Sequence, residues 1–430
     1  MEILLVFFVL LMGFLLVGVP AGYALAITSV VAFVVRWGFE SLSFGLIAQM
    51  MIYGINSFPI LAIPLFLLTG SIMNAGGISE RIFAFATAVV GHIRGALAHV
   101  NVLGSLIFSG MSGSAAADAA GLGQIEIREM VRAGYDRPFS AALSAASATI
   151  GPVIPPSIPL ILYGIIANTS VTRLFIGGIV PGLLLAFSFM IFCAYIAKKR
   201  NYPKGARVAP SVIMISFKRA FLPLMTPVII IGGIWTGLFT PTEAAAVAAA
   251  YAILLAFLYR EMDVRALFTV LRETAVSSSA IMFFLATAMI YNTALTRTQV
   301  PQIVTDFLFS LSGDALVILL LLNIILFVAG MFMSTAEVIL LLTPLIAPLL
   351  PKLGIDLVHF GLIMVLNLMI GQLTPPFGIV LYVIMRVGNI EFVPLVRALV
   401  PFYFPMAVVL LLVVLFPPIV TWLPNYVLSK

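Results

Sequence analysis

The sequence predicts an all-α, polytopic membrane protein made of two inverted-topology repeats, each with a re-entrant helical hairpin and a discontinuous transmembrane helix. Three observations predict this fold class. Of 430 residues, 63% are hydrophobic and only 9% charged; long apolar segments recur along the chain; and its glycine–proline breaks return at a fixed offset. A soluble protein carries charge on roughly a quarter of its residues. Apolar segments of ~20 residues cross a bilayer as helices, so lipid is the expected solvent.

The charge pattern indicates orientation and argues against nucleic-acid binding. The net charge is +6, but the basic residues are dispersed, apart from one cluster without any acid between residues 198 and 219. That cluster consists of Lys198, Lys199, Arg200, Lys204, Arg207, Lys218 and Arg219. Basic loops of membrane proteins face the cytoplasm, which predicts that this loop is cytoplasmic.

No enzyme motif is present in the sequence. It has no Gly-Lys-Ser/Thr phosphate loop, no His-Glu-x-x-His and no Gly-x-Ser-x-Gly. We therefore expect no enzymatic activity and no organic cofactor. The single cysteine, Cys193, lies in an apolar run and rules out an intramolecular disulfide.

The first half, residues 1–209, begins with apolar residues 3–35, which Gly18-Val19-Pro20 divides into two helices. A hairpin follows at about residues 96–124. Its centre, residues 109–121, contains small residues, hydroxyls and the carboxylate of Asp118. Such a run is too poor in bulky side chains to face lipid, and an ionisable residue at membrane depth is a functional candidate. Residues 124–132 predict a separate amphipathic helix with paired charges.

A discontinuous helix is predicted at about residues 138–168. Gly151-Pro152-Val153-Ile154-Pro155-Pro156 interrupts it, because proline lacks a backbone donor and disfavours helical geometry in the residue before it. A break of this kind leaves carbonyl groups free at membrane depth.

The second half, residues 210–430, carries the same features. Thr240-Pro241-Thr242-Glu243 predicts a capping box, so Glu243 is interpreted as a helix cap. Residues 260–273 predict an amphipathic segment and residues 277–295 a separate span. A hairpin is expected at about residues 315–350 and a discontinuous helix at about 356–387, and residues 402–422 predict one closing span.

The two halves align in one gapless register. Gly151, Pro155 and Pro156 correspond to Gly371, Pro375 and Pro376, each at an offset of 220 residues. The same offset places Gly110 on Gly330, Met111 on Met331 and Ser114 on Ser334. Ordinary glycine packing and proline kinks do not explain the shared spacing. Two repeats with a hairpin and a broken helix are typical of secondary transporters that bind substrate and ions at the repeat interface.

Hydroxyls and free carbonyls at the hairpins and breaks form two candidate sodium sites, since a hard cation prefers oxygen ligands. The first site is Ser112, Ser114, Gly151, Ile154 and Pro156, and the second is Gly330, Ser334, Thr335, Gly371, Thr374 and Pro376. Asp118 either contacts cation or substrate, or stabilises a helix N-terminus. Glu337 has the same two interpretations. Asn168 and Ser170 are further substrate candidates, and helix N-termini favour an anionic substrate.

At these residues the sequence resembles the large membrane subunit of tripartite ATP-independent periplasmic (TRAP) transporters. The matching stretches are residues 109–123, 151–164, 239–249 and 371–382. The resemblance implies an elevator-type transporter of the bacterial inner membrane, driven by sodium, with a small four-helix membrane subunit and a soluble periplasmic substrate-binding protein. It also matches Ser112, Ser114, Gly151, Ile154 and Pro156 to the first sodium site, and places Asp118 in the substrate region.

Family substrates are mostly carboxylates, including four-carbon dicarboxylates and sialic acids. Residues 122–126 and 167–170 are more similar to the sialic-acid members. The expected function is therefore sodium-gradient-driven, binding-protein-dependent uptake of a small organic acid. The alternatives are a stand-alone sodium/carboxylate symporter of a related elevator family and a passive channel.

Overall fold

We describe a computed structural model of the chain, which covers residues 2–41, 43–202, 204 and 208–428. Arg207 of the basic cluster lies outside these residues. Every named element of the described chain is helical. The first half contains α1 (Glu2–Leu16), α2 (Ala21–Trp37), α3 (Phe44–Ile55), α4 (Ala62–Ala75), α5 (Ile78–Val90), α6 (Ala96–Ser112), α7 (Ala115–Arg132), α8 (Arg137–Ala148), α9 (Ile158–Ile166) and α10 (Val171–Lys199).

The second half contains α11 (Pro210–Trp235), α12 (Pro241–Leu258), α13 (Val264–Arg297), α14 (Val300–Leu311), α15 (Ala315–Phe332), α16 (Thr335–Ile346), α17 (Leu357–Gln372), α18 (Ile379–Gly388), α19 (Phe392–Leu399), α20 (Tyr403–Leu415) and α21 (Pro418–Leu428). Seven helical segments of the described chain are long and apolar enough to cross a membrane. These features are those of a multi-pass membrane protein.

Local signals placed several helix ends correctly. The chain leaves helical structure between α1 and α2 at Gly18-Val19-Pro20, as predicted. The capping box before α12 is confirmed: Thr240 Oγ1 accepts from the Glu243 amide at 3.3 Å, and Glu243 accepts from the Thr240 amide at 2.8 Å.

Three predicted boundaries were wrong. Residues 260–295 are not an amphipathic segment and a separate span: α13 runs unbroken from Val264 to Arg297, because its middle contains neither glycine nor proline. Helix α7 likewise continues to Arg132, beyond the predicted hairpin limit and through the predicted separate helix. The predicted closing span is two helices. Phe416 precedes Pro417 and adopts φ −123° and ψ 81°, which ends α20.

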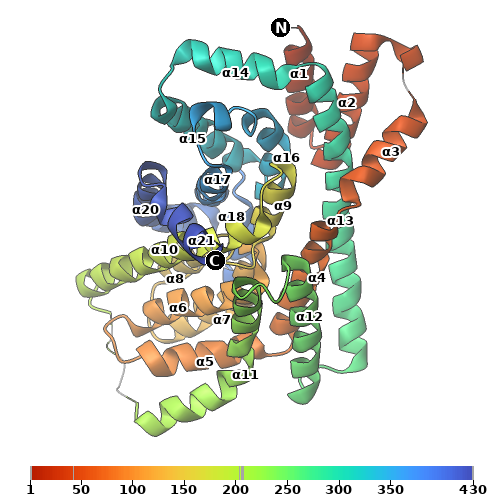
Figure 1. The fold of residues 1–430 in the computed structure, drawn as a ribbon. Helices are drawn as coiled ribbons and strands as arrows, with labels where there is room; N and C mark the ends of the chain where they lie inside the picture. The colour runs from red at the N-terminus through yellow and green to blue at the C-terminus, as the bar shows by residue number, and fades with distance from the viewer. Residues whose placement is uncertain (1, 42, 203, 205–207, 429–430) are drawn as a thin grey trace.

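The long helix α13 extends along one edge of the molecule over most of its height (Figure 1). Helices α2, α3 and α4 pack against it, and α12 packs against α4. We call α1–α5 and α11–α13 the outer group. The two hairpins, α6–α7 and α15–α16, belong to an inner group with the interrupted helices and with α10, α20 and α21.

The two halves of the inner group pack against each other reciprocally. Helix α9, after the first break, packs against α16, the return arm of the second hairpin. Helix α18, after the second break, packs against α7, the return arm of the first hairpin. At the latter contact Ile384 of α18 lies against Gly123 of α7. This arrangement makes one packed unit of both hairpins and both breaks.

Candidate functional site

The first helix break provides backbone oxygens without helical partners. Between α8 and α9 the carbonyl oxygens of Gly151, Ile154 and Pro156 accept no backbone hydrogen bond from any described residue. The Pro155–Pro156 peptide bond is cis, and so is Pro375–Pro376 in the second break. All of Gly151, Ile154 and Pro156 are buried.

The tip of the first hairpin rests directly on this break. Gly113, between α6 and α7, has φ +65°, a conformation that glycine adopts without penalty. A Cβ at this position would lie 2.5 Å from the Pro156 carbonyl oxygen. The Ile158 amide donates to the Gly113 carbonyl at 3.3 Å. The hairpin tip therefore approaches the break as closely as two backbones can.

Asp118 lies at the junction of tip and break and is only 2% exposed. One of its carboxylate oxygens, Oδ1, accepts a hydrogen bond from the Ser112 hydroxyl. The other, Oδ2, has no hydrogen-bond partner in the described chain. A Cβ at Gly151 would lie 2.5 Å from this Oδ2. The structure thus brings Ser112, Asp118, Gly151 and Pro156 together.

The other two first-site candidates have local roles as well. Ser114 is the N-cap of α7 and accepts a hydrogen bond from the Ala117 amide at 3.4 Å. The Ile154 side chain packs against Gly182 of α10. Because isoleucine has no polar side-chain atom, its backbone carbonyl is the group that could bind a cation.

The second hairpin and the second break also meet through glycine. A Cβ at Gly371 would lie 2.8 Å from the Cα of Gly330, so the two helices α15 and α17 touch at the backbone. The Phe377 amide donates to the Met331 carbonyl at 3.3 Å. Gly330 is in the last turn of α15, where carbonyls lack intrahelical partners.

The polar groups at the second tip are distributed differently. Ser334 and Glu337 form a capping box: the Ser334 amide donates to Glu337 Oε2 at 2.7 Å, so Glu337 stabilises the start of α16. The Thr335 hydroxyl is buried and has no hydrogen-bond partner in the described chain. Thr374 Oγ1 donates to the Ile370 carbonyl at 2.8 Å.

The second site is also more open than the first. Pro376 and Phe377 are exposed, whereas Gly151 and Pro156 are buried. The Phe377 ring lies 6.0 Å from the Phe332 ring, and both rings are about half exposed.

Asn168 and Ser170 lie away from this assembly. Asn168 adopts φ +51° after the end of α9, and Ser170 caps α10 by accepting from the Arg173 amide at 3.3 Å. The nine residues of α9, about 13 Å of helix, separate them from the break. The structure does not bring them to Asp118.

Glu126 is a buried polar residue that sequence reasoning missed. It belongs to the segment 124–132, predicted to be an amphipathic helix with paired charges, yet it is only 1% exposed. Ser105 Oγ of α6 lies 3.4 Å from Glu126 Oε1 and 2.9 Å from Ser147 Oγ of α8, and its one proton can be donated to either of them. Asn101 continues this network: it donates to Ser144 at 2.6 Å and accepts from Ser147 at 2.7 Å. The sequence signal was spacing, since Glu126 follows Asp118 by two helical turns and shares its face.

A model of the family described as the DctM component of the tripartite ATP-independent periplasmic transporter matches residues 8–419. The chain belongs to this family. Its resemblance to the TRAP large membrane subunit is thereby confirmed, and the family is one of transporters.

Several relatives of this TRAP permease carry substrate names. This chain is 44% identical to the sialic acid TRAP transporter large permease protein SiaM of Vibrio cholerae, over 97% of each chain. It is 41% identical to the C4-dicarboxylate TRAP transporter large permease protein DctM of Pseudomonas aeruginosa, over 86% of this chain and 87% of that one. Among solved structures, the YdaH transporter of Alcanivorax borkumensis has a similar fold, with a TM-score of 0.67, 14% identity and 90% of each chain covered.

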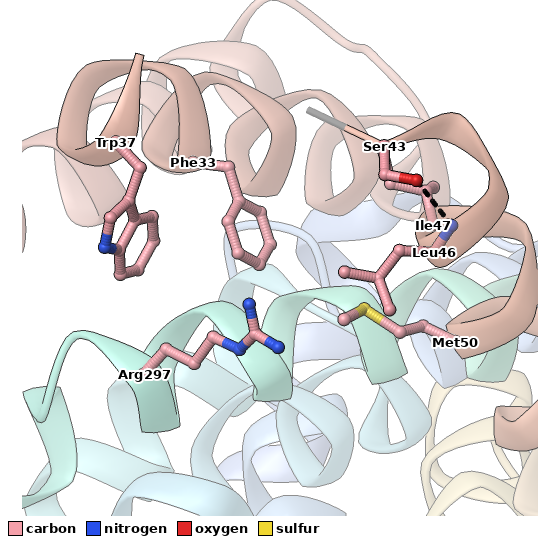
Figure 2. Close-up of a pocket in the computed structure, with 7 residues that line it drawn as sticks. All are labelled: Phe33, Trp37, Ser43, Leu46, Ile47, Met50 and Arg297. Carbon is pink, nitrogen blue, oxygen red and sulfur yellow. Dashed lines mark hydrogen bonds between the residues drawn. The ribbon is translucent and has the colours of Figure 1, made fainter. Parts of the chain in front are cut away.

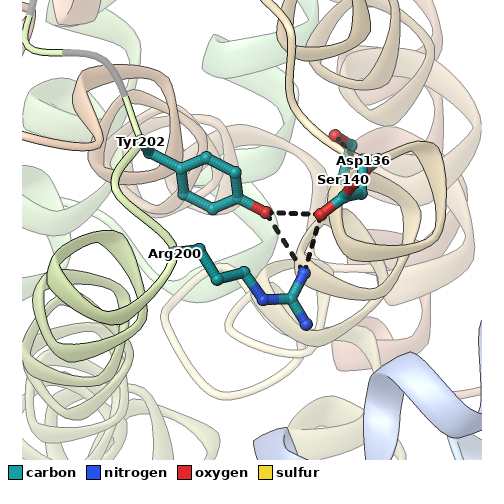
Figure 3. Close-up of polar contacts among 4 residues, drawn as sticks. All are labelled: Asp136, Ser140, Arg200 and Tyr202. Carbon is teal, nitrogen blue, oxygen red and sulfur yellow. Dashed lines mark hydrogen bonds and ion pairs between the residues drawn. The ribbon is translucent and has the colours of Figure 1, made fainter.

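A cluster of polar contacts lies at the loop between α7 and α8, which connects the first hairpin of the permease to the first interrupted helix. Asp136, between α7 and α8, accepts from Arg200 and from the Tyr202 hydroxyl, both at 2.9 Å (Figure 3). Ser140 Oγ donates to the Asp136 carbonyl at 2.9 Å. Burial raises the pKa of Tyr202 above its ordinary value. These contacts hold the C-terminal end of α10 against the loop that connects α7 of the first hairpin to α8 of the first interrupted helix.

Proposed function

We propose that this permease is the translocating large subunit of a sodium-gradient-driven system that takes up a small organic acid across the bacterial inner membrane. The observation that carries the proposal is the meeting of each hairpin tip with a helix break, at Gly113–Pro156 and Gly330–Gly371. Both junctions collect oxygens that helices leave unpaired, which is how broken helices bind coupling ions.

The donor set at both junctions suits sodium. Hard cations prefer carbonyl, hydroxyl and carboxylate oxygens, and the buried Asp118 Oδ2 and Thr335 Oγ1 have no partner in the described chain. Unpartnered buried polar atoms are costly, and a bound cation would offset that cost. We assign the carbonyls of Gly151, Ile154 and Pro156 with Ser112 and Ser114 to one sodium ion. Gly330, Ser334, Thr335, Gly371, Thr374 and Pro376 form the second site.

We propose elevator-type movement of the inner group against the outer group. The gapless offset of 220 residues supports two inverted repeats, divided near residue 209. The reciprocal packing of α9 on α16 and α18 on α7 supports movement of both repeats as one body. The outer group would then remain fixed around α13.

The substrate is a carboxylate, and sialic acid is the first candidate. SiaM, the relative with 44% identity, is named for sialic acid, and relatives at 41% and 36% are named for C4-dicarboxylate and 2,3-diketo-L-gulonate. All three substrates carry a carboxylate, whereas a relative at 38% identity is named for isethionate, a sulfonate, so the class that the named substrates share is an organic acid anion. The N-termini of α7 and α16 offer amide donors to such a group. Asp118 remains one proposed substrate residue, and Asn168 and Ser170, beyond α9 from it, remain a separate proposal for substrate contact.

The proposed partners are a small four-helix membrane subunit and a periplasmic substrate-binding protein. The sialic acid TRAP permease SiaT of Haemophilus influenzae is 42% identical, and this chain matches 66% of its length. The remaining third of SiaT leaves room for a fused small subunit.

Uptake in proteoliposomes tests the function. Vesicles with all three components should accumulate labelled sialic acid only under an inward sodium gradient and only with binding protein present. Uptake without binding protein would favour a stand-alone symporter. Non-saturable, sodium-independent flux would favour a channel and overturn the proposal. C4-dicarboxylate, tested with its own binding protein, distinguishes the wrong substrate from the wrong mechanism.

A further inference from the structure

A cavity of about 300 Å³ lies at one end of the outer group, between α2, α3 and α13. Figure 2 shows apolar side chains around it, with the Arg297 guanidinium pointing in from α13. Phe33, Leu46, Ile47 and Met50 line it, and Trp37 and Ser43 lie at its rim. One strong cation beside an apolar wall is the chemistry that suits an amphiphile with an anionic head.

The position of Arg297 along α13 places it at headgroup depth. Residues 274–296 carry no charge, and Arg272 and Glu273 precede them. These residues span about 34 Å of helix, close to the ~30 Å thickness of bilayer hydrocarbon. Trp37 at the end of α2 lines the same cavity, and tryptophan favours the membrane–water boundary.

The usual topological rule does not explain this arginine. Glu261, just before α13, pairs with Arg81 at 3.0 Å and shares a pocket with Arg219 of the basic cluster. The N-terminal end of α13 is therefore on the same side of the membrane as the basic cluster, which we expect to be cytoplasmic. Arg297 lies at the opposite end, where basic residues are disfavoured.

Arg297 has an aromatic neighbour but no acidic one. Its guanidinium carbon lies 6.0 Å from the Phe33 ring centroid. No described Asp or Glu, including Glu40 in the turn after α2, is within ion-pair distance of it. The Ser43 hydroxyl accepts from the Leu46 amide at 3.3 Å and donates to no residue of the described chain. The charge at this cavity is thus available to an anion.

We propose that this cavity binds an anionic phospholipid of the leaflet opposite the basic cluster. Arg297 and Ser43 hold the phosphate, and an acyl chain lies along Phe33 and Met50. No residue of α3 is buried, so the acyl chain can reach the cavity from the bilayer along this helix. A bidentate arginine–phosphate contact is the charge-assisted bond that fits this geometry.

Thermal unfolding of the delipidated full chain tests the site, alone and with its co-expressed small subunit. Dioleoylphosphatidylglycerol should raise the Tm more than dioleoylphosphatidylcholine, and inorganic phosphate should not raise it. Arg297→Gln should weaken phosphatidylglycerol binding about tenfold, while Arg272→Gln at the other end of α13 should leave it unchanged. Met50→Trp fills the groove, keeps the charge, and should also weaken binding.

Three outcomes would overturn the lipid site. Equal lipid affinity in the Arg297→Gln and Met50→Trp variants would place the lipid elsewhere. Equal protection by inorganic phosphate would leave only an anion site without an acyl groove. Loss of the phosphatidylglycerol effect when the small subunit is present would make this surface a subunit interface. None of these results depends on sodium-driven uptake, so the test is separate from that of the proposed function.

Discussion

The Ser112 hydroxyl donates a hydrogen bond to the Asp118 carboxylate, which joins the last residue of α6 to the first turn of α7 across the hairpin tip. The bond leaves Asp118 Oδ2 against Gly151 without a partner in the described chain. The same two side chains therefore hold the tip and present an oxygen to the break.

Replacing Ser112 by alanine should weaken both the tip and sodium binding. Loss of one partner of a buried hydrogen bond costs about 1–3 kcal/mol, and 1.4 kcal/mol corresponds to about tenfold in affinity. We expect the sodium concentration for half-maximal uptake to rise about tenfold or more. Ser109→Ala is the control, because Ser109 is equally buried and, among the described residues, bonds only to the Ser105 carbonyl of its own helix. Equal effects of the two variants would contradict a specific role for Ser112.

The closeness of tip and break predicts that Gly113→Ala disrupts uptake. Gly113 and Gly134 both have positive φ, so alanine at either should cost about 1–2 kcal/mol of backbone strain. Only at Gly113 would the new Cβ also meet the Pro156 carbonyl, since nothing lies within 4 Å at Gly134. Thermal unfolding should show the shared cost, and sodium-dependent uptake should be lost only in Gly113→Ala. Normal uptake by that variant would show that the tip need not approach the break.

Thr335→Val separates ion binding from packing at the second site. Valine keeps the shape of threonine but removes a buried hydroxyl that has no partner in the described chain. The free energy of unfolding without sodium should therefore stay unchanged or rise by about 1 kcal/mol. The stabilisation that sodium adds should fall. Thr343→Val on the same helix is the control, as the Thr343 hydroxyl faces Met364 Sδ at 3.6 Å. Full sodium stabilisation of Thr335→Val would remove this hydroxyl from the site.

Glu126 should tolerate glutamine but not alanine. No described basic residue pairs with it, so an amide of the same shape can occupy its place among the serines. Alanine would leave a cavity and Ser105 with one partner fewer, at a cost of about 1–3 kcal/mol. Urea unfolding of both variants in detergent measures the difference. A glutamine variant as unstable as the alanine variant would show that the carboxyl group itself is required.

The breaks of this permease could be predicted from sequence because they are local events. Proline and glycine at 151–156 and 371–376 interrupt helices wherever the chain places them. Helix ends that lack such a cluster of glycine and proline were predicted less well. Helix α13 runs unbroken because it contains no glycine or proline, and α20 ends at Phe416 because proline follows that residue.

The sequence by itself determined that this is a membrane protein with two hairpins, two broken helices and a register of 220 residues between them, because composition, proline and spacing act over short range. Only the tertiary structure decided which groups meet. It buried Glu126 while leaving Arg128 and Glu129 on the surface, and it placed Asn168 beyond α9 from the break. The physical reason is that burial and pairing depend on neighbours distant in sequence, as when Gly113 meets Pro156, and no local pattern records those neighbours.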